Sequence, residues 1–465
     1  MKNFYTSFII SCLMLAFFTA SGQEVTTQPA ISQEEYQSLL KRVEQLELQQ
    51  QSNDNTDTPR VKNRGILSIG GYGEAVMQRF FYSDNFNRYT YPDLYKTAKS
   101  RGQFDLPHIV FMMSYDFGRG WKVSSEIEYE HGGTGSAIEI EADEFGEYES
   151  EIERGGEVVI EQFWLEKSFN EAVNIRAGHI IIPFGLTNYK HLPTEFLSVL
   201  RQEEESTLFP CTWHETGISF WGKKRNWRYE FIFAAGLDAD KFNDANWIKG
   251  GGTSAYEFSI SNAYAGAFRV DYYAAKGLRL GLSGYYGHSA ANSLKADRYK
   301  GLLGAVMLAS FDLDYHDHNV WILLNADYGH LTDSKALSQI NKNLPRNSPS
   351  PRTNVASDAL CYSLHFGYDF FGLNDKLKSR EMKFYLFGHL GYVNSMLKTA
   401  EGILADKRFA KHILSGGINF YPIKEIVLKV EFASRLFPHA NYNTENTFLI
   451  GICYAGLFTK NFNKK

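Results

Sequence analysis

Hydrophobic and polar residues alternate along much of the chain from residue 65 onwards. In the segment WRYEFIFAAGLD, Trp227, Tyr229 and Phe231 share one face, whereas Arg228 and Glu230 share the other. The segments EIVLKVEFASRLF and LRLGLSGYYG repeat this pattern. Alternation with a period of two residues predicts β-strands that have one apolar and one polar face. Runs of about nine to twelve residues are longer than most strands of soluble sheets and are typical of strands that cross a membrane at a tilt.

About sixteen such strands are predicted, an even number, which is usual for outer-membrane barrels. No segment beyond the N-terminus approaches the roughly 18 to 20 apolar residues that a membrane helix requires. Only helices and closed barrels satisfy their backbone groups in lipid, so these strands would have to close into a barrel. The predicted strands start near Ile66, Phe104, Trp121, Val158, Asn174, Thr216, Trp227, Ala263, Leu278, Lys300, Val320, Asp358, Met382, Lys411, Ile426 and Thr447.

The predicted connections alternate between short and long. The short ones are DFGRG, FNEAVN, GKKRN, AAKG, YHDHN, YPIKE and the somewhat longer FGLNDKLKSRE. The long ones are residues 81–102, 132–156, 188–214, 240–261, 289–298, 332–357 and 395–408. Outer-membrane barrels have short periplasmic turns and long external loops, so the fold class is predicted to be all-β, a transmembrane antiparallel barrel with periplasmic termini. The alternative, a secreted sandwich or propeller, would bury its apolar face and would lack this asymmetry.

The N-terminus has the features of an export signal. Lys2 precedes the apolar run FIISCLMLAFF, and Ala20 and Gly22 occupy the small-residue positions before a cleavage site. Residues 1–22 are therefore predicted to be a signal peptide. Cys12 lies inside the apolar run rather than after it, which argues against a lipid-anchored cysteine.

Residues 23–52 are predicted to form a helical, coiled-coil extension in the periplasm. A 3-4-3-4 spacing, typical of a coiled-coil seam, relates Tyr36, Leu39, Val43, Leu46 and Gln50. The alternative is an exposed amphipathic helix, because the pattern is shorter than the three or four heptads that define a coiled coil. Residues 53–64 are predicted to be a linker, and residues 65–465 the barrel.

Composition narrows the function classes. Aromatic residues make up 15% of the chain, which also holds 39 Gly and 12 Pro, and this usage favours strands and turns. A net charge of −5 indicates no basic surface for nucleic acid, so that partner is excluded. Beyond the signal peptide, Cys211, Cys361 and Cys453 form no C-x-x-C pair, so neither a disulfide framework nor a zinc site is predicted. No cofactor is expected.

Several segments resemble the phosphate-selective porin O and P family of Gram-negative outer membranes, in particular its branch with acidic loops. The resemblance lies in DLPHIVFMMSYDFGRGW, SEIEYEHGGTGSAIEIEADEFGEYE, GGEVVIEQFWLEKSF, IRAGHIIIPFGLTN, STLFPCTWHETGISFWG, YAGAFRVDYY and LRLGLSGYYGHS. It covers residues 66–289 strongly and the remainder weakly. The resemblance implies a sixteen-stranded, trimeric, water-filled channel. The chain departs from the family in its tail after Phe458 and in having only part of an Arg and Lys ladder.

The resemblance also implies that the third long loop, residues 188–213, folds into the lumen and narrows it. Its segment EFLSVLRQEEESTLFP places Phe196, Val199 and Leu200 at helical spacing. We expect these three to pack on the wall, because a loop inside a wide barrel must be apolar towards the wall and polar towards the water. The polar residues of the predicted constriction are Glu195, Arg201, Glu203, Glu204 and Glu205. The alternative is a surface helix over the mouth.

Charged residues on the polar faces of the strands predict a basic inner belt below an acidic vestibule, which would select ions by their charge. The basic residues are Lys122, Arg176, Arg228, Arg269, Arg279, Lys429 and Arg435. The vestibule residues are Glu126, Glu128 and Glu130, beneath the acidic loop IEIEADEFGEYESEIE. Each charge could instead be solvated or paired, as Arg269 would be with Asp271 or Glu230.

Two possible metal sites find little support in the sequence. The acidic loop could bind a divalent cation through its carboxylates, but it lacks the ordered spacing of a calcium loop. Cys211, His214 and Glu215 lie together in CTWHE, but they diverge at the entry to a strand. No metal site is therefore predicted.

The sequence as a whole predicts an outer-membrane porin in outer-membrane lipid, a homotrimer through which small hydrophilic solutes diffuse passively. Anions such as phosphate are one class of solute that the resemblance implies. The protein is predicted not to be an enzyme. The alternatives are a lipase-like barrel enzyme, which needs a Ser/His pair at the outer rim, and a structural or adhesive barrel plugged by its loops.

Overall fold

The computed structural model describes residues 65–98, 101–133, 139–140, 150–151, 156–252, 260–293, 296–344 and 350–459. The structural statements below concern these residues. The predicted signal peptide, helical extension and linker lie outside them, as does most of the acidic loop.

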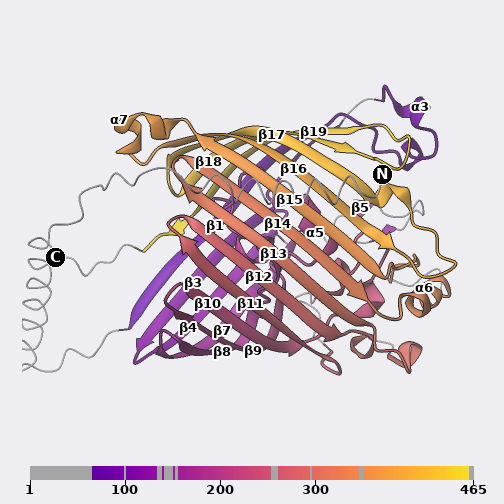
Figure 1. Cartoon of the computed structure of the whole chain (residues 1–465), viewed down its shortest axis with the longest axis horizontal. Helices are drawn as coiled ribbons and strands as arrows, with labels where there is room; N and C mark the ends of the chain where they lie inside the picture. The colour runs from indigo at the N-terminus through magenta and orange to yellow at the C-terminus, as the bar shows by residue number, and fades with distance from the viewer. Residues whose placement is uncertain are drawn as a thin grey trace, which may run out of the picture. The chain divides into compact units, whose positions relative to one another are not determined.

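Seventeen strands form one closed antiparallel sheet, in which β1 pairs with β19 (Figure 1). The strands of the barrel are β1 (Ile66–Phe80), β2 (Gly102–Asp105), β3 (His108–Gly118), β4 (Trp121–Glu130), β7 (Glu157–Asn170), β8 (Val173–Ile181), β9 (His214–Lys224), β10 (Trp227–Ala235), β11 (Tyr264–Ala275), β12 (Leu278–His288), β13 (Ala305–Asp317), β14 (Val320–Leu331), β15 (Asp358–Asp369), β16 (Lys383–Lys398), β17 (Ala410–Ile423), β18 (Ile426–Leu436) and β19 (Glu445–Leu457). Two further short strands, β5 (Glu139–Ile140) and β6 (Ser150–Glu151), pair with each other.

The predicted barrel of sixteen strands is confirmed, because β2 and β3 both pair with β1 and are two parts of one wall strand. Pro107 lies between these parts and has no N–H to donate to the ladder, which explains the interruption. One predicted start is wrong by several residues: β13 begins at Ala305 rather than near Lys300, since Ala296–Tyr299 is a 3-10 helix.

The outer surface of the barrel is apolar. On β16, Leu386 and Leu390 are more than half exposed, whereas Phe387 and His389 between them are buried on the inner face. The same alternation recurs around the barrel. Exposed aromatic side chains lie next to the short turns, where outer-membrane barrels carry an aromatic girdle. These are Phe117, Trp121, Phe169, Trp227 and Phe370.

The short connections lie at one end of the barrel and the long ones at the other. In the turn between β13 and β14, His318 and Asn319 both have positive φ, the geometry of a tight hairpin that suits the twist of the strands. Helix α7 (Asp375–Lys378) lies at the short-turn end, and α3 (Pro92–Tyr95) and α6 (Ser334–Lys342) lie at the long-loop end (Figure 1). None of the helices in the described ranges is long and apolar enough to cross a bilayer.

The remaining helices are short. Helices α4 and α5 lie in the connection from β8 to β9, with bounds Gly185–Tyr189 and Glu203–Leu208. The 3-10 helices are η1 (Phe86–Arg88), η2 (Ala239–Lys241), η3 (Lys249–Gly251), η4 (Ala290–Asn292), η5 (Ala296–Tyr299), η6 (Phe371–Leu373) and η7 (Lys407–Phe409).

Candidate channel constriction

The connection between β8 and β9 crosses the interior of the barrel. We call residues 185–213 the inward segment. Strands β8 and β9 are the fifth and sixth of the sixteen wall strands, and the segment contacts β16 to β18, the thirteenth to fifteenth, on the opposite side. The segment therefore divides the lumen.

Side chains of the opposite wall bind the backbone of the inward segment. Lys429 is fully buried and donates from Nζ to the carbonyl oxygens of Phe196 and Ser198, at 2.9 and 2.7 Å. Asn419 donates to the carbonyl of Leu197 at 2.8 Å, and Glu431 accepts from the N–H of Val199 at 2.7 Å. These wall groups replace the hydrogen bonds that a helix would make within itself.

The helical spacing of Phe196, Val199 and Leu200 does not correspond to a helix. Residues 196–202 have no regular secondary structure, and α5 begins only at Glu203. The wall satisfies the backbone at residues 196–199, so a helix is not needed there. Three glutamates then occupy the first turn of α5, where negative charge is favourable, and Pro210 follows its end.

Apolar side chains of the inward segment pack on the wall in two places. Phe196 and Leu197 lie in a buried cluster that includes Trp321 and Tyr385. Val199 lies in a second buried cluster, formed with Val76, Ala433 and Leu449, and Leu200 packs against it.

Two of the three glutamates of α5 contact the protein rather than project into the lumen, in contrast to the prediction. Glu205 accepts hydrogen bonds from the N–H groups of Leu186 and Thr187, at 3.2 and 3.0 Å, and from Asn325 at 2.7 Å. Burial and the nearby Asp327 raise the pKa of Glu205 well above its ordinary value. Glu204 is 1% exposed and lies 3.0 Å from His389 Nε2.

Glu203 is the one glutamate of α5 with substantial exposure. Arg435 donates to both of its oxygens, at 2.9 and 2.8 Å, and Lys411 Nζ lies 3.0 Å away. Burial raises the pKa of Glu203, but the two cations lower it more, so the net shift is downwards. This pair of cations joins the start of α5 to β17 and β18.

The other two polar residues predicted for the constriction also contact the protein. Arg201 donates to Thr212 Oγ1 at 3.1 Å and to Tyr72 OH at 3.4 Å. Glu195 is partly buried, and burial raises its pKa against the opposing effect of Lys190.

The predicted basic belt differs most from the structure. Four of its arginines face inward but are paired with four carboxylates, so this part of the belt carries no excess positive charge. Arg269 is fully buried and lies 2.9 Å from both Asp271 and Asp312. The cations Arg176, Arg228, Arg269 and Arg279 contact the anions Glu166, Glu230, Asp271 and Asp312.

These paired charges also hold the inward segment. Arg269 Nη1 donates to the carbonyl of Gly185 at 2.9 Å, and the guanidinium groups of Arg269 and Arg279 lie 4.1 and 4.5 Å from the ring centre of Tyr189. A Cβ atom at Gly281 would lie 2.5 Å from both Arg269 Nη2 and Asp312 Oδ2, so this glycine makes room for the pair. Of the remaining predicted belt residues, Lys122 lies over the ring of Trp164.

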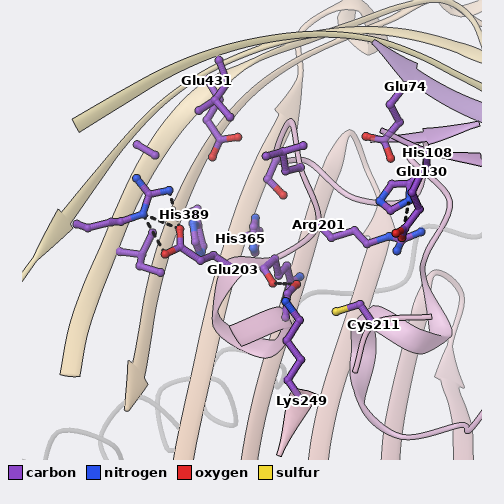
Figure 2. Close-up of a pocket in the computed structure, with 18 of the residues that line it drawn as sticks. Glu74, His108, Glu130, Arg201, Glu203, Cys211, Lys249, His365, His389 and Glu431 are labelled. Atoms are coloured by element: carbon purple, nitrogen blue, oxygen red, sulfur yellow. Dashed lines mark hydrogen bonds and ion pairs between the residues drawn. The ribbon is translucent and has the colours of Figure 1, made fainter. Parts of the chain in front are cut away.

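A chamber lies on the long-loop side of the inward segment and has a volume of about 580 Å³ (Figure 2). Its lining includes Glu74, His108, Glu130, Arg201, Glu203 and Lys249. Of the predicted vestibule residues, Glu130 lines this chamber. Glu126 and Glu128 are 6% and 2% exposed, so they are buried rather than solvated.

Several residues of the chamber were not predicted from the sequence. His365 and His389 stack with ring centres 4.0 Å apart, and Glu74 and His108 face Glu130 (Figure 2). The sequence indicated that these residues lie on the polar faces of their strands. It did not indicate which of their side chains contact one another, because that depends on strand register.

Comparisons with known proteins do not assign this chain to a family. No family model matches the sequence. An uncharacterized protein of Aquifex aeolicus strain VF5 is 27% identical over 219 residues, which are 47% of this chain and 43% of that protein. The match therefore spans less than half of the relative's length.

Three solved structures align with most of this chain at low sequence identity. The outer membrane channel DcaP of Acinetobacter baumannii aligns with 86% of this chain and 100% of its own, at 12% identity and a TM-score of 0.45. OmpF of Salmonella typhi in complex with daunomycin aligns with 84% and 97%, at 12% identity and 0.47. OmpT of Vibrio cholerae aligns with 84% and 98%, at 10% identity and 0.44. The assignment of the fold rests on the closed strand ladder itself.

Proposed function

We propose that this protein is an outer-membrane porin, a narrow channel through which small hydrophilic solutes diffuse passively. The observation that carries the proposal is a closed sixteen-stranded barrel with an apolar outside and a polar chamber within. An apolar belt on a closed barrel suits a bilayer, because all its backbone groups are paired within the sheet. The proposed orientation places the short turns in the periplasm.

The inward segment sets the size limit of the proposed channel. It crosses from β8 to the opposite wall and is fixed there by Lys429, Asn419 and Glu431. A solute that enters the chamber would have to pass beside the inward segment to cross the barrel. Small solutes are therefore favoured over large ones.

We further propose that the channel has a weak preference for anions, including phosphate. A recess of about 270 Å³ at the long-loop end is lined by four cations, Arg88, Arg408, Lys411 and Arg435. The carboxylates of the lining are Glu203 and Glu445, and two more, Asp406 and Asp244, interact with Arg408 from outside it. The excess of cations in the lining therefore supports only a weak preference, in contrast to the strong one that an unpaired arginine ladder would give.

Planar bilayer recording tests the channel proposal. We expect wild-type protein to give discrete open-channel steps, and liposomes containing it to swell with small sugars but not with large ones. The reversal potential in a KCl gradient then measures selectivity. Arg408→Gln should reduce any anion preference, whereas Lys407→Gln, which changes an exposed lysine outside the lining, should not.

The plugged structural barrel is the second candidate, and the many contacts of the inward segment favour it. A variant in which residues 194–209 are replaced by a short Gly/Ser linker separates the two. If the wild type gives no channel steps in bilayer recording but this variant does, the result would support the plugged barrel. If neither protein gives channel steps and both fold correctly, the result would overturn the channel proposal.

The lipase-like alternative needs a serine and a histidine at the outer rim, and it finds no support in the pair that lies beside Asp358. Ser357 Oγ donates to Asp358 Oδ2 at 2.7 Å, and His330 Nδ1 lies 3.0 Å from Asp358 Oδ1. A catalytic serine is activated by a direct hydrogen bond to its histidine. Here the carboxylate lies between them. Ser415 Oγ and His389 Nδ1 lie 3.2 Å apart, but His389 lines the chamber rather than the rim, and Ser415 donates to Glu431. The proposed homotrimer rests on the family resemblance and is tested by cross-linking of unheated protein.

A further inference from the structure

Three neighbouring strands bring a histidine and several carboxylates together at the edge of the chamber. His108, the first residue of β3, lies opposite Glu130 in the ladder, and Glu128 is two residues earlier on the same face of β4. Glu74 comes from β1 on the other side of β3, one position beyond the paired residues Gly73 and Ile109. The strand register alone therefore gathers these four side chains.

The distances are those of potential metal ligands. His108 Nδ1 lies 2.6 Å from Glu128 Oε1 and 3.9 Å from Glu130 Oε1, and the three ligand atoms lie within 4.8 Å of one another. Glu74 is only 3% exposed, and neither of its oxygens has a hydrogen-bond partner. Figure 2 shows the Glu74 carboxylate turned towards His108 and Glu130.

The charge around this group is unbalanced. Besides Glu74, Glu128 and Glu130, the carboxylates of Glu126 and Glu161 lie close by. Arg201 interacts with Glu128 and Glu161, Arg176 with Glu126, and Lys429 with Glu74, so the carboxylates still outnumber these cations. One oxygen each of Glu126 and Glu161 also has no hydrogen-bond partner. Buried carboxylates in excess are costly unless they are protonated or paired with a cation. A bound divalent cation would offset two of these charges.

We propose that His108, Glu128 and Glu130 bind one divalent transition-metal ion, with Glu74 as a fourth ligand. A mixture of imidazole and carboxylate groups suits Zn²⁺ and its neighbours better than Ca²⁺ or Mg²⁺, which prefer oxygen alone. The ion would reach the site through the chamber, which His108, Glu130 and Glu74 all line. Small shifts of the side chains would open the short contact between His108 and Glu128 to accept it.

Titration of tag-free, chelator-treated protein in detergent with Zn²⁺ tests this site. We expect one ion per chain by isothermal titration calorimetry, and visible absorption bands of a protein-bound ion when Co²⁺ replaces Zn²⁺. His108→Gln and Glu130→Gln should each weaken binding by more than about tenfold, because each removes a ligand. His330→Gln is the matched control, since it removes a histidine paired with a carboxylate elsewhere on the wall, and it should bind as the wild type does.

Binding that is absent up to millimolar Zn²⁺, or unchanged in both ligand variants, would overturn the proposal. If His108→Gln fails to fold, as judged by its β-sheet circular dichroism, Glu130→Gln decides, because Glu130 lies at the end of β4 beside the chamber. The measurement does not depend on conduction. A protein that binds Zn²⁺ but gives no channel steps would therefore support this site and contradict the porin proposal.

Discussion

Two parts of the barrel interior carry many charged side chains but balance them differently. We call them the paired wall and the acidic wall. The paired wall comprises Arg176, Arg228, Arg269, Arg279, Glu166, Glu230, Asp271 and Asp312, four cations and four anions. The acidic wall comprises Glu74, Glu126, Glu128, Glu130 and Glu161, with His108 and the inward segment's Arg201 beside them.

The difference lies in what each wall holds. The paired wall binds the start of the inward segment through Gly185 and Tyr189, so its charges are structural. The acidic wall borders the chamber, and neither oxygen of Glu74 has a hydrogen-bond partner. In the paired wall Asp271 Oδ2 also lacks a hydrogen bond, but it lies 3.5 Å from Arg228 Nη1. A charge that faces the lumen is thus not in itself a selectivity element, because its partners decide whether it acts on a passing ion.

Among the variants that test this difference, Arg269→Ala should lower the free energy of unfolding most, because it removes a central cation of the paired wall. The substitution would leave buried Asp312 with Arg279 as its remaining arginine, and Asp271 with Arg279 and the more distant Arg228. Breaking a buried ion pair in this way costs about 3 to 5 kcal/mol. We expect that loss in the free energy of unfolding, measured by urea titration in lipid vesicles.

The double variant Arg269→Met with Asp312→Asn sharpens the test. It removes opposite charges together, so it should be less destabilised than the sum of the two single variants. Lys276→Ala is the control, since that lysine is 90% exposed and should contribute no measurable stability. An Arg269→Ala barrel as stable as the wild type would contradict the structural role of the paired wall.

Lys429→Met should have the next largest effect on stability, because Lys429 holds the inward segment to the wall opposite β8 and β9. It leaves the carbonyls of Phe196 and Ser198 without their buried donor, which costs about 1 to 3 kcal/mol. A less firmly held segment should also give larger and noisier channel steps in bilayers. Lys424→Met, at an exposed position in the same hairpin, should change neither quantity. Equal conductance of the two variants would argue against an anchoring role for Lys429.

The sequence was sufficient to predict the barrel but not its interior pairing. Alternation with a period of two is a local signal, so each strand could be recognised from its own residues. The Arg269–Asp312 pair joins β11 to β13 across Gly281 of β12, and it forms only at one register. A sequence without known register indicates which side chains face inward, but not which of them meet.

The inward segment shows the same limit for local structure. Helical spacing of Phe196, Val199 and Leu200 was the only available signal, yet Lys429 and Asn419 compete for the backbone carbonyls there. Those residues lie more than two hundred positions further along the chain. Tertiary contacts therefore override the local pattern, and the same holds for His108, whose relation to Glu130 is set by the ladder.

Neutralising single carboxylates should affect the two walls in opposite directions, by a smaller amount. In metal-free protein, Glu126→Gln should leave stability unchanged or raise it by up to about 1 kcal/mol, because it removes one of several like charges. Asp271→Asn should instead destabilise, because Asp271 is the shared partner of Arg228, Arg269 and Arg279. Urea titrations of both variants at neutral pH give the comparison. Destabilisation of equal size in both would show that the acidic wall is balanced too.

The smallest expected effect is a dependence on acidic pH at the start of α5. The cations Arg435 and Lys411 lower the pKa of Glu203 below its ordinary value of 4.5 despite the opposing effect of burial. A lowered pKa in the folded protein means that the ionised form contributes stability above pH 4.5, and that this contribution is lost as the pH falls through the folded-state pKa. Other carboxylates titrate in the same range, so the informative quantity is a difference between variants. Glu203→Gln should be less stable than the wild type at neutral pH, and the gap should narrow steadily as the pH is lowered below 4.5. A gap that stays constant over this range would mean that the Glu203 charge does not hold α5 to β17 and β18.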